Sequence, residues 1–106
     1  MDVKKASIKK GIGGKFEEVV KELLPAYTGY VEVQHDIAFQ THPSHTHPTD
    51  EILHILEGSI YFTVERDTVL CQAGDRIHLP KQTVHSSKAG PDGCTYVISI
   101  LKSILK

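Results

Sequence analysis

The sequence predicts an all-β protein of the sandwich or double-sheet barrel type, with one short helix near its N-terminus. Two observations support this fold class. The helical spacing of apolar residues is confined to residues 15–24, and from residue 29 onward short apolar–polar alternations are separated by turn residues at intervals of roughly 8–12. The 106 residues contain no internal repeat, low-complexity tract or linker. We therefore expect a single domain, with an N-terminal arm and helix over 1–28 and a barrel over 29–101.

The composition is that of an ordinary globular protein and excludes several classes of function. Hydrophobic residues make up 40% and charged residues 24%, which argues against a disordered chain. The net charge of −1 provides no basic field for nucleic acid. No apolar run approaches the roughly 18 residues of a membrane helix, and the N-terminus lacks the apolar core of a secretory signal. We expect a cytoplasmic protein that binds neither nucleic acid nor membrane.

A helix is predicted over residues 15–24, after a Lys- and Gly-rich stretch, 1–14, that is expected to be loose. Its apolar residues share one stripe at the i, i+3, i+4 spacing. The stripe consists of Phe16, Val19, Val20, Leu23 and Leu24. It is expected to dock against the rest of the domain, with a partner-binding helix as the alternative. Pro25 is expected to end the helix.

A half-buried strand is predicted in residues 30–39. Its period of two is that of a strand with one face toward a core. The apolar set is Val31, Val33, Ile37 and Phe39, and the alternating polar set is Glu32, Gln34 and Asp36. Residues 41–50 continue as an extended segment that is interrupted by Pro43 and Pro48.

Further short strands are predicted from the same alternation and from turn residues. They cover residues 51–57, 59–65, 68–72, 76–80, 83–87 and 94–101. Turns are expected at Gly58, 66–67, 73–74 and 80–83, and a loop at 90–93. The predicted barrel core contains Leu53, Ile55, Ile60, Phe62 and Val64. On the opposite face, the apolar Ile52 and Leu56 need cover, which favours a homodimer.

Histidine is unusually frequent, with seven residues against three Phe and no Trp. Histidine is the commonest metal ligand and the usual acid or base near neutral pH. His45 and His47 are two residues apart, so on an extended chain they point to the same side. Glu51 follows after a Pro-containing bend that can return its carboxylate to the same point. Two nitrogens and one oxygen from one segment suit a transition metal.

These residues resemble the first of the two motifs of the cupin family, and a later stretch resembles the second. The first motif has the form HxH-x3-E-x6-G. The second has the form G-x5-P-x4-H. The matching residues are His45, His47, Glu51 and Gly58, then Gly74, Pro80 and His85. Family positions normally held by Gly, Gly and Asn carry Phe39, Gln82 and Ala89, which puts local loop shape in doubt. The resemblance covers about 29–101 and implies a jelly-roll barrel.

The resemblance also implies one divalent transition metal, Fe, Mn, Ni, Co or Zn, bound by His45, His47, Glu51 and His85. With iron, the implied chemistry is that of a dioxygenase acting on a small organic substrate. With a redox-inert metal, a Lewis-acid isomerase is the alternative. A non-catalytic module that binds or senses a small molecule or sugar is the other alternative. The resemblance likewise implies a homodimer.

The remaining histidines and the cysteines carry weaker expectations. His54 is expected to point away from the metal, on the outer face or at a dimer interface. His78 faces outward if Ile77 and Leu79 face the core, and otherwise enters the barrel as a base beside the metal ligands. His42 is expected at the barrel mouth, with a role as substitute ligand as the alternative; His35 also precedes the motif. Cys71 and Cys94 form no CxxC pair and are expected to be reduced and partly buried, rather than disulfide-bonded or exposed to a pocket.

Overall fold

The computed structural model describes residues 6–24 and 29–101, with the side chain of residue 101 excepted. The described residues form a mainly antiparallel β-structure with one short helix, so the predicted fold class is confirmed. In chain order the elements are β1 (Ser7–Lys9), α1 (Phe16–Leu23), β2 (Gly29–Asp36), β3 (Thr41–His45), β4 (Asp50–Val64), β5 (Asp67–Gln72), β6 (Arg76–Leu79) and β7 (His85–Leu101). Pro25, the predicted end of the helix, lies outside the described residues. No helix in the described ranges is long and apolar enough to cross a membrane.

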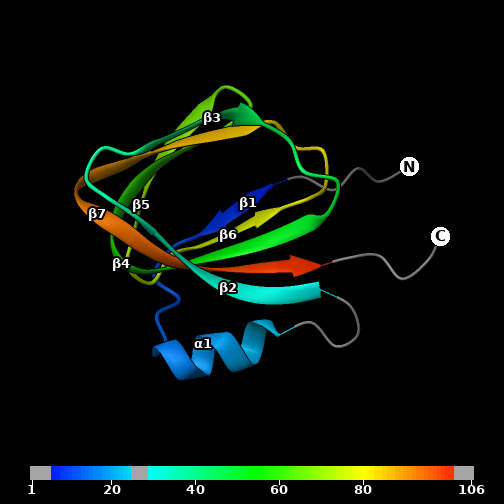
Figure 1. Cartoon of the computed structure of the whole chain (residues 1–106), viewed down its shortest axis with the longest axis vertical. Coiled ribbons are helices and arrows are strands. Elements are labelled where there is room, and N and C mark those ends of the chain that lie inside the picture. Colours follow the sequence, from blue (N-terminus) through cyan, green and yellow to red (C-terminus); the bar gives the residue numbers. More distant parts are fainter. Residues whose placement is uncertain (1–5, 25–28, 102–106) are drawn as a thin grey trace.

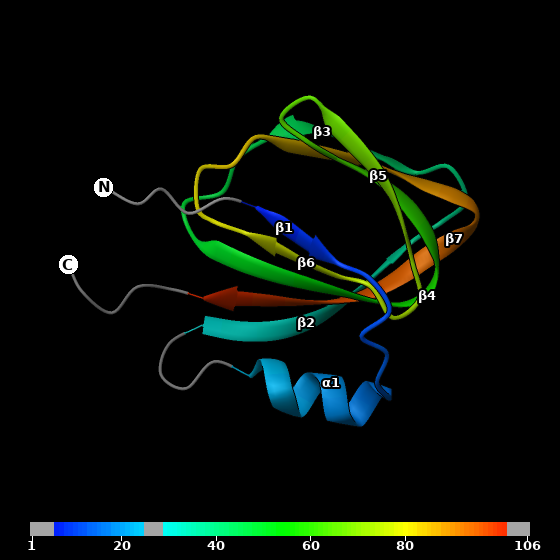
Figure 2. The same cartoon turned by 180° about the vertical axis from the view of Figure 1, so that it is seen from behind.

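Two long strands, β4 and β7, connect the two layers of the barrel (Figures 1 and 2). The first part of β4 pairs with β6 and with the last part of β7. The second part of β4 pairs with β5 and with the first part of β7. Strand β2 extends the first layer beside β7, and β3 extends the second layer at the other end of β7. Each long strand therefore contributes to both layers of the barrel.

Two predicted strand boundaries are wrong, and both lie at glycines inside β4 and β7. Gly58 was expected to be a turn and 90–93 a loop, but both lie inside continuous strands. Gly58 has φ +79°, and the pairing of β4 with β7 shifts register on both sides of it. A Cβ on Gly58 would lie 2.1 Å from the carbonyl oxygen of Gly93, so the two strands cross closely there. Glycine marks the bend where a strand passes from one layer to the other.

The barrel interior contains the predicted hydrophobic core. Leu53, Ile55, Ile60 and Phe62 of β4 are all buried, which confirms their predicted position. Val64 is half-buried and packs against the same cluster. The alternation of β4 therefore identifies its inner face correctly.

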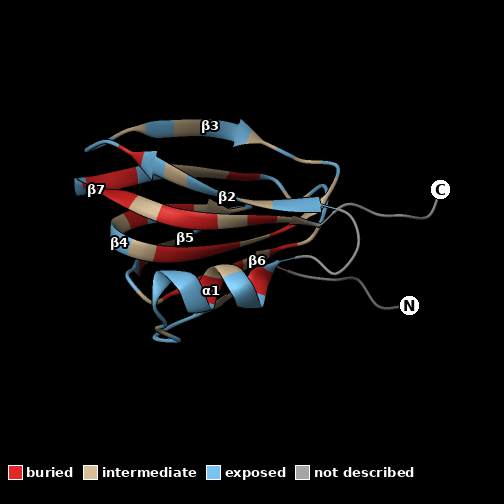
Figure 3. Cartoon of the chain, turned by 60° about the horizontal axis from the view of Figure 1, so that its bottom comes forward, coloured by how far each residue is buried: buried red, intermediate tan, exposed pale blue. Residues whose placement is uncertain are grey.

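Helix α1 covers the outer face of the first layer (Figure 3). Val19 and Leu23 are buried and pack against Val97, together with Ile52 and Leu56 of β4. The apolar stripe is narrower than predicted, because Phe16 and Leu24 at its edges are exposed. Since the chain's own helix covers Ile52 and Leu56, these two residues no longer argue for a dimer.

The N-terminal arm is more ordered than the composition predicts. Residues Ser7–Lys9 were expected to be loose but form β1, which pairs with β6. Beyond it, Asp75 receives the backbone N–H of Gly11 at 2.8 Å and an ion pair from Lys10 at 2.6 Å. These contacts attach the arm to the turn before β6.

Strand β2 has the predicted period but presents the opposite face to the interior. Val33 is 50% exposed, whereas Asp36 is fully buried. Ile37 and Phe39, beyond the end of β2, are also exposed. The polar side of this strand faces the barrel interior, where Gln34 lines a cavity rather than a packed core.

Candidate functional site

Three histidines converge inside the barrel at the junction of β3 and β7. His45 ends β3, His85 begins β7, and the two are partners in the β3–β7 pairing. His47 follows two residues after His45 in the connection to β4. One ligand nitrogen from each ring lies within 4.8 Å of the others. This triad of His45, His47 and His85 is able to hold a metal ion.

Backbone carbonyls orient two of the three rings. Nδ1 of His45 lies 2.5 Å from the carbonyl oxygen of Pro43, and Nδ1 of His85 lies 2.9 Å from that of Thr83. Because a carbonyl oxygen only accepts, each Nδ1 carries the hydrogen and donates it. The lone pair of each neutral ring is then on Nε2, which is how metal-binding histidines are commonly fixed. Phe62 stacks against His85 with ring centroids 5.6 Å apart.

The surroundings of His47 and His85 favour neutral imidazoles. Burial lowers the pKa of His47, and the neighbouring His45 lowers it further. Burial is also the main cause of the lowered pKa of His85, and the hydrogen bond to Thr83 opposes it only in part. A metal binds the neutral form of histidine, so these side chains need lose no proton to coordinate near neutral pH.

Glu51, the fourth predicted ligand, lies beside the triad without belonging to it. Its Oε2 atom is 3.5 Å from Nδ1 of His47, and the residue is buried at the start of β4. Burial raises the pKa of this carboxyl group, with a smaller opposing effect from His45. A buried carboxylate next to three imidazoles would be stabilised by a cation. The structure thus brings three of the four predicted ligands together and places the fourth next to one of them.

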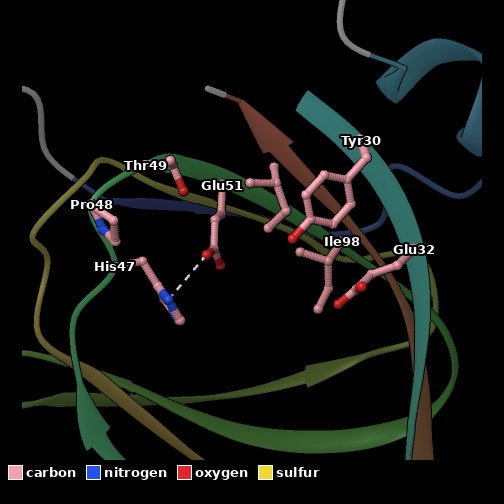
Figure 4. A pocket seen from close by; sticks show the side chains of 8 residues that line it. Tyr30, Glu32, His47, Pro48, Thr49, Glu51 and Ile98 are labelled. Carbon is pink, nitrogen blue, oxygen red and sulfur yellow. Dashed lines mark ion pairs between the residues drawn. The ribbon is translucent and has the colours of Figure 1, made fainter. Parts of the chain in front are cut away.

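Two cavities meet at the triad. An inner cavity of about 180 Å³ is lined by the triad, Glu51 and side chains of β2, β3, β4 and β7. An outer cavity of about 350 Å³ shares His47, Glu51 and Ile98 with it. Figure 4 shows the outer cavity, with the carboxylate of Glu51 turned toward His47 and with Tyr30 and Glu32 of β2 on the facing wall. Neither lining contains Lys or Arg.

A buried hydrogen-bond network beside the triad was missed by the sequence reasoning. Asp36 accepts a hydrogen bond from the Tyr96 hydroxyl at 3.0 Å and from the Gln34 amide at 3.2 Å. Its two oxygens also lie 3.0 and 3.1 Å from Nε2 of His42. Gln34, His42 and Tyr96 all line the inner cavity. The available signal was the row of polar residues at a spacing of two in residues 32–36, which suits a polar cavity wall as well as a solvent-facing side.

The other histidines lie outside the inner cavity's lining. His54 is on the outer face of β4 as predicted, but α1 and the arm bury it completely. Its Nδ1 accepts a hydrogen bond from Arg76 at 3.1 Å, and Arg76 makes a two-point ion pair with Glu22 of α1. His78 lies between Ile77 and Leu79, which are buried in the core, so it faces outward. His35 is exposed and bonds the Thr95 hydroxyl at 2.8 Å.

Two departures from the family pattern retain the backbone shape of the residue they replace. Phe39 has φ +62° and Gln82 has φ +64°, a region that favours glycine. The backbone N–H of Gln82 donates to the carbonyl oxygen of His47 at 2.7 Å, which ties the turn before β7 to the triad. The loop shape that the substitutions put in doubt is therefore present.

The two cysteines are free and buried, as predicted. Burial raises the pKa of Cys71 to about 11 and that of Cys94 to about 12. Both thiols are therefore protonated and unreactive near neutral pH. They belong to the hydrophobic core and not to the lining of either cavity.

Comparison with known proteins places this barrel in a family. The model of the cupin domain matches residues 35–99, whereas no curated protein matches the chain. Similar solved structures include an RmlC-like cupin from Shewanella frigidimarina (16% identity, TM-score 0.66, covering 72% of this chain and 68% of that one). KdgF from Halomonas sp. shares 20% identity with a TM-score of 0.63 and coverages of 74% and 76%. The DMSP lyase DddQ from Ruegeria pomeroyi shares 21% identity with a TM-score of 0.67, covering 74% of this chain and 41% of that one. The chain belongs to the cupin domain family.

Proposed function

We propose that this protein is a metal-dependent enzyme that acts on a small organic molecule. The single observation that carries the proposal is the convergence of three histidines on one cavity, beside a buried carboxylate. Three imidazoles and one carboxylate suit Fe, Mn, Ni, Co or Zn in the divalent state. Glu51 is proposed as the fourth ligand because a cation would compensate its buried charge.

The residues around the three histidines would orient the metal-binding rings and exclude water from the inner cavity. The carbonyl groups of Pro43 and Thr83 hold the rings of His45 and His85 in one orientation. Phe62 and Leu53 supply apolar walls to the inner cavity, which strengthens electrostatic interactions within it. A divalent cation at this site would supply a Lewis acid or, as iron, a centre for dioxygen chemistry.

Two reaction classes follow from the identity of the metal. Iron would favour the dioxygenase predicted from the sequence. A redox-inert metal would favour Lewis-acid chemistry such as isomerisation, which the polar cavity residues Gln34, His42 and Tyr96 support. One similar structure is named a lyase, so this fold carries bond-breaking chemistry in another protein.

A homodimer and a cytoplasmic location remain predictions. Light scattering at micromolar concentration tests the homodimer.

The test is the metal content of the full-length protein, purified without added metal. We expect about one transition-metal ion per chain, lost in His47→Ala. His35→Gln is the matched control, because it removes an exposed histidine away from both cavities. Iron would lead to an oxygen-uptake screen and zinc, manganese, nickel or cobalt to an isomerase screen, whereas metal binding without any turnover would indicate a binding module. No metal in the purified protein and no uptake on incubation would contradict the proposal.

A further inference from the structure

We propose that His42, oriented by Asp36, is the general base of the inner cavity, and that the substrate is a small uncharged carbonyl compound with a hydrogen on the adjacent carbon. This inference rests on the proposed function, because it places the substrate next to the triad. It adds the group that moves the proton and the chemical class of the molecule that loses it.

The contact between His42 and Asp36 defines which nitrogen can act. Both carboxylate oxygens of Asp36 lie within 3.1 Å of Nε2 of His42. Since a carboxylate accepts, Nε2 carries the hydrogen, and the lone pair of the neutral ring is on Nδ1. A carboxylate at one nitrogen of a histidine base also stabilises the positive charge that the ring gains with a proton. Asp36 is therefore a positioning residue and His42 the residue that accepts the proton.

The carboxylate itself is held in one orientation by further donors. The Tyr96 hydroxyl and the Gln34 amide both donate to Asp36, which is fully buried. His42 is only half-buried, so the network runs from the interior to a side chain that a substrate could reach. A fully hydrogen-bonded buried network of this kind is rigid, and rigidity is what a proton acceptor of fixed direction requires.

An irregularity in β3 brings His42 and the triad to the same cavity. His42 and His45 are three residues apart, so in a regular strand they would point to opposite faces. The pairing of β3 with β7 shifts between them: His42 is opposite Ser87 and His45 is opposite His85. Over this stretch β3 advances by three residues while β7 advances by two, so β3 carries one extra residue, which is a β-bulge. As a result both histidines line the inner cavity.

The charge of the cavity walls defines the substrate class. Neither cavity contains Lys or Arg, and the outer cavity carries the two carboxylates of Glu32 and Glu51. An anionic substrate would meet these carboxylates and no Lys or Arg, and a cationic one would be repelled by the divalent ion proposed at the triad, so the site favours an uncharged substrate. We place the carbonyl oxygen at the triad and the hydrogen of the neighbouring carbon at His42, because the triad and His42 line the same cavity.

The proposed step is balanced without an oxidant or reductant. The C–H bond next to the carbonyl breaks, its proton passes to Nδ1 of His42, and its electron pair moves toward the carbonyl oxygen to give an enolate. Return of the proton from His42 to the same carbon restores the C–H bond and the carbonyl group and regenerates the neutral ring. In heavy water the returned atom is deuterium, so the step can be followed even before the natural substrate is known.

The test is the exchange of carbon-bound hydrogen in dihydroxyacetone and hydroxyacetone, measured by proton NMR in heavy water with the zinc-loaded full-length protein. We expect wild type to catalyse the loss of the signal next to the carbonyl. His42→Gln should slow it by about 100-fold, the usual contribution of a positioned base. His35→Gln, the matched surface control, should exchange at the wild-type rate. Bound zinc should remain at wild-type content in both variants.

A second measurement reports on Asp36 independently of turnover. Nitrogen NMR of the His42 ring should show a hydrogen-bonded Nε2–H, protected from exchange with solvent, in wild type and in Tyr96→Phe, and loss of that protection in Asp36→Ala. This readout needs neither metal nor substrate. It therefore tests the Asp36–His42 pair even if the triad binds no zinc, a result that would refute the proposed function alone.

Three results would overturn the inference. The first is no catalysed exchange by wild type with zinc bound. The second is an unchanged exchange rate in His42→Gln. The third is loss of zinc from that variant, which would make His42 a metal ligand. A hydrogen on Nδ1 in wild type would likewise refute the orientation assigned to the base.

Discussion

Strands β2 and β4 both alternate apolar and polar residues, but β4 buries its apolar side whereas β2 buries its polar side. In β4 the apolar Ile55 and Ile60 fill the barrel, as the alternation predicts. In β2 the polar Asp36 is buried and the apolar Val33 is exposed. The difference follows from what lies beside each strand, because β4 packs within a hydrophobic cluster, whereas the polar side of β2 contributes Gln34 to a cavity and Asp36 to a buried hydrogen-bond network. Periodicity identifies the two faces of a strand, and only the neighbouring space decides which of them is inside.

The largest expected effect is that of a substitution in the hydrophobic core to which β4 contributes. Ile60→Ala removes most of a side chain that is 1% exposed, so it leaves a cavity in the core. We expect the free energy of unfolding to fall by about 2–5 kcal/mol. Urea denaturation followed by circular dichroism measures it. A loss below that of an ordinary surface substitution would contradict the assigned core.

On β2 the decisive substitution is Asp36→Ala. If Asp36 faced solvent, as in the usual half-buried strand, the change would have almost no effect on stability. In the structure it leaves Tyr96, Gln34 and His42 without their shared acceptor. We expect a loss of about 1–3 kcal/mol in the same urea experiment. A near-zero effect would show that β2 presents its apolar side inward after all.

The outer face of β4 offers a test through pH. Burial lowers the pKa of His54, and the guanidinium of Arg76 lowers it further. The unfolded chain therefore binds a proton at a higher pH than the folded protein does. The contribution of His54 to the free energy of unfolding should be fully present well above pH 6.5, the ordinary pKa of about 6.5 being that of the unfolded chain. It should be lost as the pH falls from that value toward the lowered pKa of the folded state, by at most about 1.4 kcal/mol per pH unit. Urea midpoints between pH 8 and 5 should fall less steeply in His54→Gln than in wild type, and equal slopes would contradict the buried position.

The smallest expected effect is on the exposed side of β2. Val33→Thr changes an apolar side chain that is half exposed, on the outer face of β2. We expect stability to change by less than about 0.5 kcal/mol. Thermal unfolding of the variant beside Ile60→Ala gives the comparison directly. A loss similar to that of the core variant would reverse the assignment of the two faces.

The fold could be predicted because alternation and turn residues are local signals. His45 and His47 share a face through their spacing, whereas the link from these two residues to His85 comes from the resemblance to the second cupin motif. The boundaries at Gly58 and 90–93 could not be predicted, because a glycine between two strand-like runs indicates a turn and a sharp bend equally well. Only the close crossing of the two long strands distinguishes these cases.

The Asp36–His42 pair depends on features that no single segment contains. Its formation requires β2 to turn its polar side inward and β3 to carry one extra residue against β7. It also requires Tyr96, which is paired with Gln34 across the β2–β7 ladder. These are properties of register between strands far apart in the sequence. The position of Glu51 beside His47, rather than within the triad, likewise depends on the bend between β3 and β4.

The unbroken course of β7 has a consequence for how this chain folds. Residues of β7 pair with β2, β3 and β4, so neither layer is complete before the last strand has been synthesised. Nearly every pairing of β7 joins residues distant along the chain, and closing such long loops is slow. We therefore expect the barrel to fold in milliseconds to seconds, after synthesis of β7, as one cooperative step in which the triad assembles together with the layers that carry it.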